Sequence, residues 1–143
     1  MTLQPVEARA YGPDSTAQEV ASLKAGVYQY SPDIIMWREV PVMSIFQVEK
    51  FAEKIRELTS TMSSFSYLID LQEAPLPSAE IRAKLVDVFK GDSKLRRIAA
   101  FTGKNFLVNI ACKFVFTTAG VTAFTVHKTL EQALAALSQP HGA

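Results

Sequence analysis

The chain has 143 residues and a mass of 15.8 kDa, which is enough for one domain with a proper core and too little for two. Apolar residues make up 48% and charged residues 20%, a balance typical of globular proteins that excludes a disordered tail. Lysine and arginine number 15 against 14 acidic residues, so the net charge of +1 predicts no general attraction to nucleic acid or to anionic lipid.

The cysteine count and the hydropathy pattern exclude further classes. Cys112 is the only cysteine, so one chain can form neither an internal disulfide nor a cysteine-based zinc site. The spacing of the two histidines, His127 and His141, is not that of metal-binding ligands. We therefore expect no metal and no cofactor. No segment reaches the roughly 18 apolar residues of a membrane span, and the N-terminus lacks a signal-peptide core. We therefore expect a cytoplasmic protein without a membrane span.

Residues 1–25 are less apolar than the rest and are interrupted by proline and glycine. Within them, Thr16 followed by Glu19 is a capping-box pattern that predicts a short helix carrying Val20 and Leu23. We expect residues 1–25 to form an arm that lies on a single domain, residues 26–143.

A hairpin and a long helix are expected next. Residues 26–32 and 34–40 are rich in β-branched and aromatic residues, and the turn residues between them predict a β-hairpin that ends at Pro41. Ser44 and Gln47 form a second capping-box pattern. The apolar residues that follow recur every three or four positions, which predicts an amphipathic helix over about 45–61.

The remaining chain alternates strands and helices. We expect strands at 65–71, 95–101 and 121–126, with helices from Ser78 to about Phe89, over about 105–118, and after a third capping box at Thr129 and Gln132. The order ββαβαβαβα predicts an α/β domain with a mostly parallel sheet, an antiparallel edge hairpin and covering helices. The strand at 65–71 should be central and buried on both faces, because its apolar residues do not alternate.

The expected helix at 105–118 carries more apolar residues than a sheet-covering helix needs. Its polar residues form one narrow stripe, Asn105, Asn109, Lys113 and Thr117. The excess apolar surface must be covered by the N-terminal arm or a neighbouring helix, by a partner, or by an apolar ligand. We expect a contact with a second subunit or an apolar ligand that involves Phe106, Ile110 and Phe114.

Three segments together resemble a known family. In residues 118–124 (TAGVTAF), a small residue and a glycine come directly before an expected strand that contains an aromatic residue. Residues 129–137 (TLEQALAAL) are expected to form the next helix. Residues 67–71 (YLIDL) are a strand ending in Asp-Leu. Over roughly 26–137 this ordered set is similar to the SpoIIAA-like domains, which include the STAS anti-sigma-factor antagonists and uncharacterised bacterial relatives. The resemblance implies a SpoIIAA-like (STAS-like) fold and a non-enzymatic regulatory module that binds a protein partner or forms a homodimer.

The chain departs from the antagonists at their phosphorylated serine. They carry an Asp-Ser-Ser/Thr-Gly signature near the start of the helix after the Asp-Leu strand, whereas residues 76–80 here read LPSAE and lack the glycine. Counting from Asp70 places the phosphorylatable position at Ala79, one residue past Ser78. The chain thus resembles the uncharacterised branch, part of which is compared with CRAL-TRIO lipid-binding domains. That comparison implies an alternative role as a carrier or sensor of an apolar, lipid-like small molecule.

Two polar residues are candidates for a functional role. Ser78 is either a helix N-cap or a phosphorylation switch, since a phosphate is stabilised at a helix N-terminus. Asp70 ends a strand, where parallel α/β sheets bind ligands, although an aspartate there also orders loops. Cys112 has no histidine near it in sequence, and no set of residues resembles a catalytic site. We therefore expect no enzymatic activity.

Overall fold

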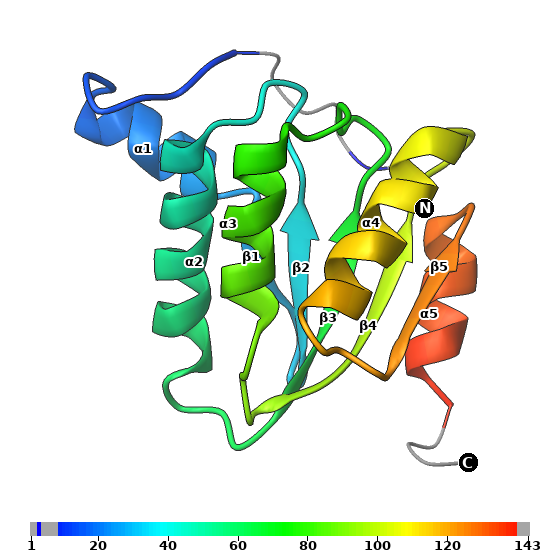
Figure 1. Ribbon diagram of the computed structural model, residues 1–143. Coiled ribbons are helices and arrows are strands. Elements are labelled where there is room, and N and C mark those ends of the chain that lie inside the picture. The colour runs from blue at the N-terminus through cyan, green and yellow to red at the C-terminus, as the bar shows by residue number, and fades with distance from the viewer. Residues whose placement is uncertain (1–2, 4–8, 140–143) are drawn as a thin grey trace.

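The computed structural model describes residue 3 and residues 9–139, which form a five-stranded sheet with helices on both faces (Figure 1). The strands follow sequence order across the sheet: β1 (Val27–Ser31), β2 (Ile34–Arg38), β3 (Phe65–Asp70), β4 (Leu95–Phe101) and β5 (Phe124–His127). The hairpin β1–β2 is antiparallel and every other pair is parallel. The predicted α/β class and mixed sheet are confirmed.

The helices are α1 (Ala17–Lys24), α2 (Ile45–Thr59), α3 (Ala79–Phe89), α4 (Phe106–Thr118) and α5 (Leu130–Leu137). Figure 1 shows α2, α3 and α4 side by side on one face of the sheet and α5 on the opposite face. Parallel neighbours require a crossover, and the helices α2, α3 and α4 provide the three crossovers.

The central strand β3 is buried along its whole length, from Phe65 to Asp70, as predicted. Its residues alternate between the two cores: Tyr67 and Ile69 belong to the core beneath α2, α3 and α4, whereas Leu68 belongs to the core beneath α5. Burial on both faces explains why the segment reads as a continuous apolar run rather than an alternating one.

Aromatic side chains dominate the larger core. The Trp37 ring lies with its centroid 5.4 Å from Phe51, 6.0 Å from Tyr67 and 5.3 Å from Phe89. Phe89 in turn lies 5.4 Å from Phe116 of α4. These rings link β2, β3, α2, α3 and α4, so packing of the three helices depends on one continuous aromatic cluster.

The helix α1 of the N-terminal arm packs against α2, whereas Leu3 packs against the core beneath α5. Leu23 of α1 and Tyr11 are buried in the larger core. The Lys24 ammonium group lies 2.9 Å from the Glu57 carboxylate of α2. The predicted capping box at Thr16 is present, with both of its hydrogen bonds.

Two local predictions were wrong in detail. The last strand begins at Phe124 rather than at residue 121, because residues 120–121 close the end of α4. Gly120 adopts a φ of 81°, and the Val121 N–H donates to the Phe116 carbonyl at 3.0 Å, the 6→1 bond of a Schellman motif. At α2, Ser44 caps the Gln47 N–H at 3.0 Å, but the Gln47 side chain turns away to Glu39, so the second half of that capping box is absent.

We predict that Phe89→Ala lowers the free energy of unfolding by about 3–5 kcal/mol, because it leaves a cavity at the centre of the aromatic cluster. Urea unfolding followed by fluorescence measures the loss, and Trp37 is the only tryptophan. Val86→Ala, at a half-buried site on the same helix, should cost about 1 kcal/mol. Equal losses in the two variants would contradict the central position of Phe89.

Candidate functional site

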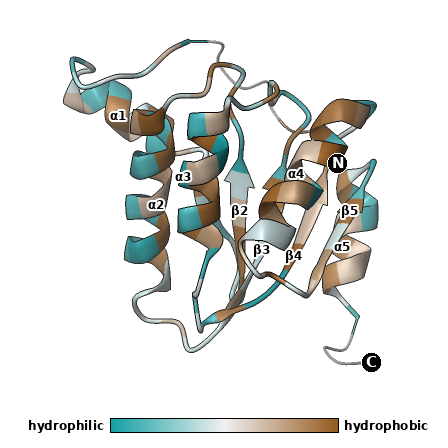
Figure 2. Ribbon diagram, viewed as in Figure 1, coloured by the Kyte–Doolittle hydropathy of each residue, from teal (hydrophilic) through white to brown (hydrophobic). Residues whose placement is uncertain are grey.

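The outer face of α4 is the most apolar exposed surface among the described helices. Its exposed fractions are 71% for Phe106, 58% for Leu107, 51% for Ile110 and 58% for Phe114. Figure 2 shows hydrophobic residues on the outward side of α4, whereas the outward side of α2 is hydrophilic. These four residues are called the α4 patch below. The three candidates predicted on this helix therefore lie together on the surface.

The opposite face of α4 packs onto the sheet and α3. Val108, Cys112, Val115 and Phe116 are buried there. Residues 9–24 of the N-terminal arm lie on the α2 side of the three-helix layer, and Leu3 packs against the core beneath α5, so these residues leave the α4 patch exposed (Figure 1). Covering by that part of the arm, one of the explanations considered from sequence, is thereby removed.

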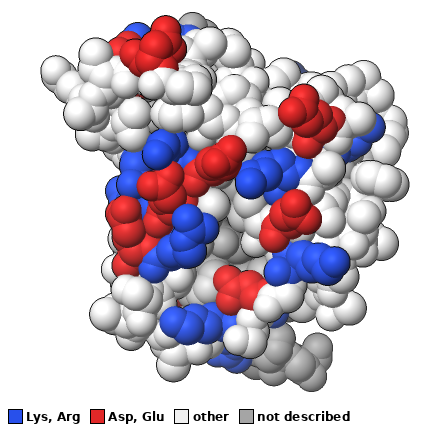
Figure 3. Space-filling view, turned by 60° about the vertical axis from the view of Figure 1, so that its left-hand side comes forward, with Lys and Arg blue, Asp and Glu red and all other residues white. Residues whose placement is uncertain are grey.

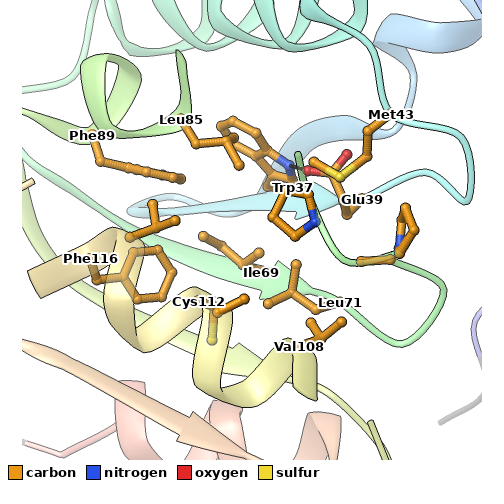
Figure 4. Close-up of a pocket in the computed structure, with 15 residues that line it drawn as sticks. Trp37, Glu39, Met43, Ile69, Leu71, Leu85, Phe89, Val108, Cys112 and Phe116 are labelled. Carbon is orange, nitrogen blue, oxygen red and sulfur yellow. Dashed lines mark hydrogen bonds between the residues drawn. The ribbon is translucent and has the colours of Figure 1, made fainter. Parts of the chain in front are cut away.

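A small apolar cavity lies between α4, α3 and the ends of β2 and β3. Its volume is about 50 Å³. In Figure 4 side chains of α4 point across it toward side chains of the sheet and α3. Its walls are almost entirely hydrocarbon, and they include Trp37, Ile69, Leu71, Leu85, Val108 and Phe116.

One charged residue, Glu39, lines this apolar cavity. It follows β2 directly and is 3% exposed. Its Oε2 accepts a hydrogen bond from Trp37 Nε1 at 3.0 Å, and its Oε1 accepts from the Val40 N–H at 3.1 Å and from Gln47 Nε2 at 2.8 Å. All three donors are uncharged.

The surroundings of Glu39 disfavour its ionised form overall. Burial raises the pKa of the Glu39 carboxyl above its ordinary value, and the three hydrogen bonds oppose that rise. The Gln47 amide beside it is completely buried, and its Oε1 accepts no hydrogen bond from the described residues. Glu39 thus brings a buried carboxyl group to an apolar cavity, and Gln47 supports it from α2.

Ser78 is the N-cap of α3, as one of the two sequence interpretations predicted. Its Oγ accepts a hydrogen bond from the Ile81 N–H at 3.2 Å. The residue is exposed, so modification of its hydroxyl would meet no steric obstacle from the described residues, but it would compete with the cap. A switch role for Ser78 stays a prediction.

Asp70 orders its surroundings at the end of β3. Its carboxylate is paired with Arg38 Nε of β2 at 3.1 Å and accepts the Gln72 N–H at 3.0 Å. Strand alternation places it with Leu68 on the face covered by α5, opposite α4. The structure therefore does not bring Asp70 together with the α4 patch.

The titratable groups near α4 and β5 do not form a nucleophile–base pair among the described residues. Burial raises the pKa of the Cys112 thiol to about 11, and its Sγ donates to the Asn109 carbonyl at 3.2 Å. His127 instead lies 2.8 Å from the Thr125 hydroxyl, and burial lowers its pKa. Cys112 is thus a neutral thiol at neutral pH.

The surface over α2 and α3 differs from that over α4. Figure 3 shows positive and negative side chains intermingled there, around a groove of about 480 Å³. Both signs line the groove, including Glu53, Arg56, Lys84 and Asp87. Across residue 3 and residues 9–139 there is no cluster of three potential metal ligands and no helix that is long and apolar enough to span a bilayer.

Sequence reasoning missed Glu39, although a signal was present. Ile35, Trp37 and Glu39 share one face of an extended segment, so a carboxylate continues a row of buried apolar residues. A charge at such a position is rarely buried without a partner. Its depth could be known only once the loop that contains Met43 and the helices α3 and α4 were seen to close over it.

No protein-family model, no curated protein and no solved structure matches this chain.

We predict that Ser78→Ala lowers the free energy of unfolding by about 1 kcal/mol, because it removes the N-cap of α3. Ser78→Asp is the matched control, since aspartate is an equally good cap and should preserve stability. Denaturant unfolding measures both variants. A loss of less than about 0.3 kcal/mol in Ser78→Ala would show that the cap contributes little.

We predict a pH dependence that comes from Glu39. Because its pKa is raised in the folded state, the folded protein binds more protons than the unfolded one between about pH 4 and that raised value. Stability should therefore fall as pH rises through this window, and Glu39→Gln should lack that part of the fall. Thermal unfolding of both proteins from pH 4 to 8 tests this, and parallel curves would contradict it.

Proposed function

We propose that this chain is a non-enzymatic interaction module, and that its α4 patch is buried against the α4 patch of a second copy. The observation that carries the proposal is the exposure of four large apolar side chains on one helix face, from 51% to 71%. Scattered apolar residues need no explanation on a surface, but a contiguous patch of this kind marks an interaction site.

The size of the patch fits a two-fold contact. If a fully exposed side chain of this kind offers about 200 Å², the four residues expose roughly 480 Å² on one protomer. Two copies meeting through the same face would bury close to 1,000 Å² of apolar side chain, before any polar rim is counted. This area is slightly below the roughly 1,000 Å² that a biological interface should exceed, so the surrounding residues must supply the remainder.

The charge pattern around the patch also favours association. Within the helix, Lys113 is the only charged residue, so few ions need to lose water when the patch is buried. A hydrogen bond of 3.4 Å from Asn105 Nδ2 to the Ala74 carbonyl ties the start of α4 to the loop that carries Leu76, itself 56% exposed. That loop can extend the apolar contact beyond the helix.

The alternative role as a carrier of a lipid-like molecule has weaker support. The cavity beneath α4 measures about 50 Å³, whereas a cavity of about 150 Å³ is needed for benzene. An acyl chain would therefore require α3 and α4 to separate. An interaction module needs no such change, and it is the role that the SpoIIAA-like resemblance of residues 118–124 and 129–137 also implies.

We predict that the unmodified chain sediments as a dimer at tens of micromolar, and that Phe114→Asp weakens the dimer at least 100-fold, because it places a charge in the centre of the interface. At 58% exposure in the free protomer, Phe114 can be replaced without unfolding the domain. Circular dichroism verifies the fold of the variant, and sedimentation velocity measures association.

Gln18→Asp is the matched control, because it adds the same charge on an exposed position of α1, at the opposite side of the helical layer. It should remain dimeric. A parent protein that stays monomeric up to about a millimolar would overturn the proposal that a second copy covers the patch. A folded, dimeric Phe114→Asp variant would show that the dimer uses another surface.

A further inference from the structure

We propose that the cavity beneath α4 binds a small primary ammonium compound, whose ammonium group pairs with the Glu39 carboxylate while its short hydrocarbon part fills the cavity. The site lies on the inner side of α4 and does not depend on the α4 patch or on dimer formation. It stands at the carboxyl ends of β2 and β3, the edge at which parallel α/β sheets bind ligands.

The charge of Glu39 is the first argument. Glu39 is 3% exposed, and the groups that donate to its carboxylate are the Trp37 indole, the Val40 amide and the Gln47 amide. None of them carries a positive charge, although buried carboxylates are ordinarily paired with a cation. A cationic ligand would supply that charge and would stabilise the ionised form of Glu39, which the surroundings alone disfavour.

The distribution of acceptors is the second argument, and it favours an ammonium group. A carboxylate accepts about four hydrogen bonds, and Glu39 receives two on Oε1 but one on Oε2, so an acceptor position remains on Oε2. A primary ammonium group carries only donors and no acceptor, so it can occupy this position on Glu39 Oε2.

The cavity walls set the remainder of the ligand. Trp37 lines the cavity beside Glu39, and an indole ring attracts cations through its face. The volume of about 50 Å³ has room for three or four non-hydrogen atoms, because a cavity of this kind needs about 10–15 Å³ to hold one water molecule. It therefore admits an ethyl or propyl ammonium ion, and an aromatic amine would be too large.

Trp37 also provides a specific probe of the site. It is the only tryptophan of the chain, and its indole N–H donates directly to Glu39 Oε2. The indole signal in a ¹H–¹⁵N NMR spectrum is therefore a single, assigned reporter. We expect it to shift saturably as ethylammonium chloride is added, with a Kd on the order of 1–10 mM, because so small a ligand makes few contacts.

The controls distinguish binding through the ammonium charge from binding of any small apolar molecule in the cavity. Sodium chloride at the same concentrations and ethanol, which has the same carbon chain without the charge, should each shift the signal at least tenfold less. Glu39→Gln should lose the response to ethylammonium. Ala111→Leu keeps Glu39 but fills the cavity from α4, and it should bind at least tenfold more weakly.

Three results would overturn the proposal: an unshifted indole signal up to 200 mM ethylammonium (about twenty times the weakest expected Kd), an equal response to ethanol, or an unchanged response in folded Glu39→Gln. If Glu39→Gln does not fold, Ala111→Leu decides the question, because unchanged binding in that folded variant would place the ligand elsewhere.

Discussion

Because β3 is buried on both faces, the sheet needs a helical layer on each side, and the rest of the fold follows from this constraint. Parallel pairing of β3 with β2 and β4 requires crossovers, and these place α2 and α3 on the same face as α4. The other face is covered by α5, whose Ala133 is fully buried in the same core as Ala99 of β4. Small residues at this contact allow the helix to approach the sheet closely.

The position of α4 at one side of the three-helix layer explains its unusual composition. It has a helix neighbour, α3, on one side only, so its inner face meets the sheet and α3 while its outer face meets solvent. On the inner face, Phe116 joins the aromatic cluster through Phe89, and Val108 lies in the same core. The outer residues have no such partner within the described chain, and this leaves them free to form an interface. One helix thus serves both the stability of the monomer and, in our proposal, its association.

Glu39 shows how a polar group is kept at the margin of the same core. The indole of Trp37 contributes its ring to the aromatic cluster and its N–H to the Glu39 carboxylate, so one residue satisfies both environments. The Gln47 side chain donates to the same carboxylate and does not bond the backbone of Ser44, as a capping box would require. This choice is explained by the two free-energy costs involved. A buried carboxyl group that lacks a hydrogen-bond donor costs more than the missing half of the capping box at α2.

The sequence by itself determined the elements and their order, because hydrophobic period and capping residues act over a few positions. The caps at Thr16, Ser78 and Thr129 and the doubly buried strand were predicted from local patterns and are present. The excess of apolar residues on the helix at 106–118 was likewise visible before its exposure was known.

Only the tertiary structure decided which surfaces remain open and which polar groups are enclosed. The start of β5 was misplaced because the Schellman motif of α4 uses residues 120–121, and its bond from Val121 to Phe116 depends on where the helix stops. The burial of Glu39 depends on the closure of α3, α4 and the Met43 loop over the end of β2. Burial is a property of contacts between segments far apart in the chain, so periodicity within one segment could not reveal it.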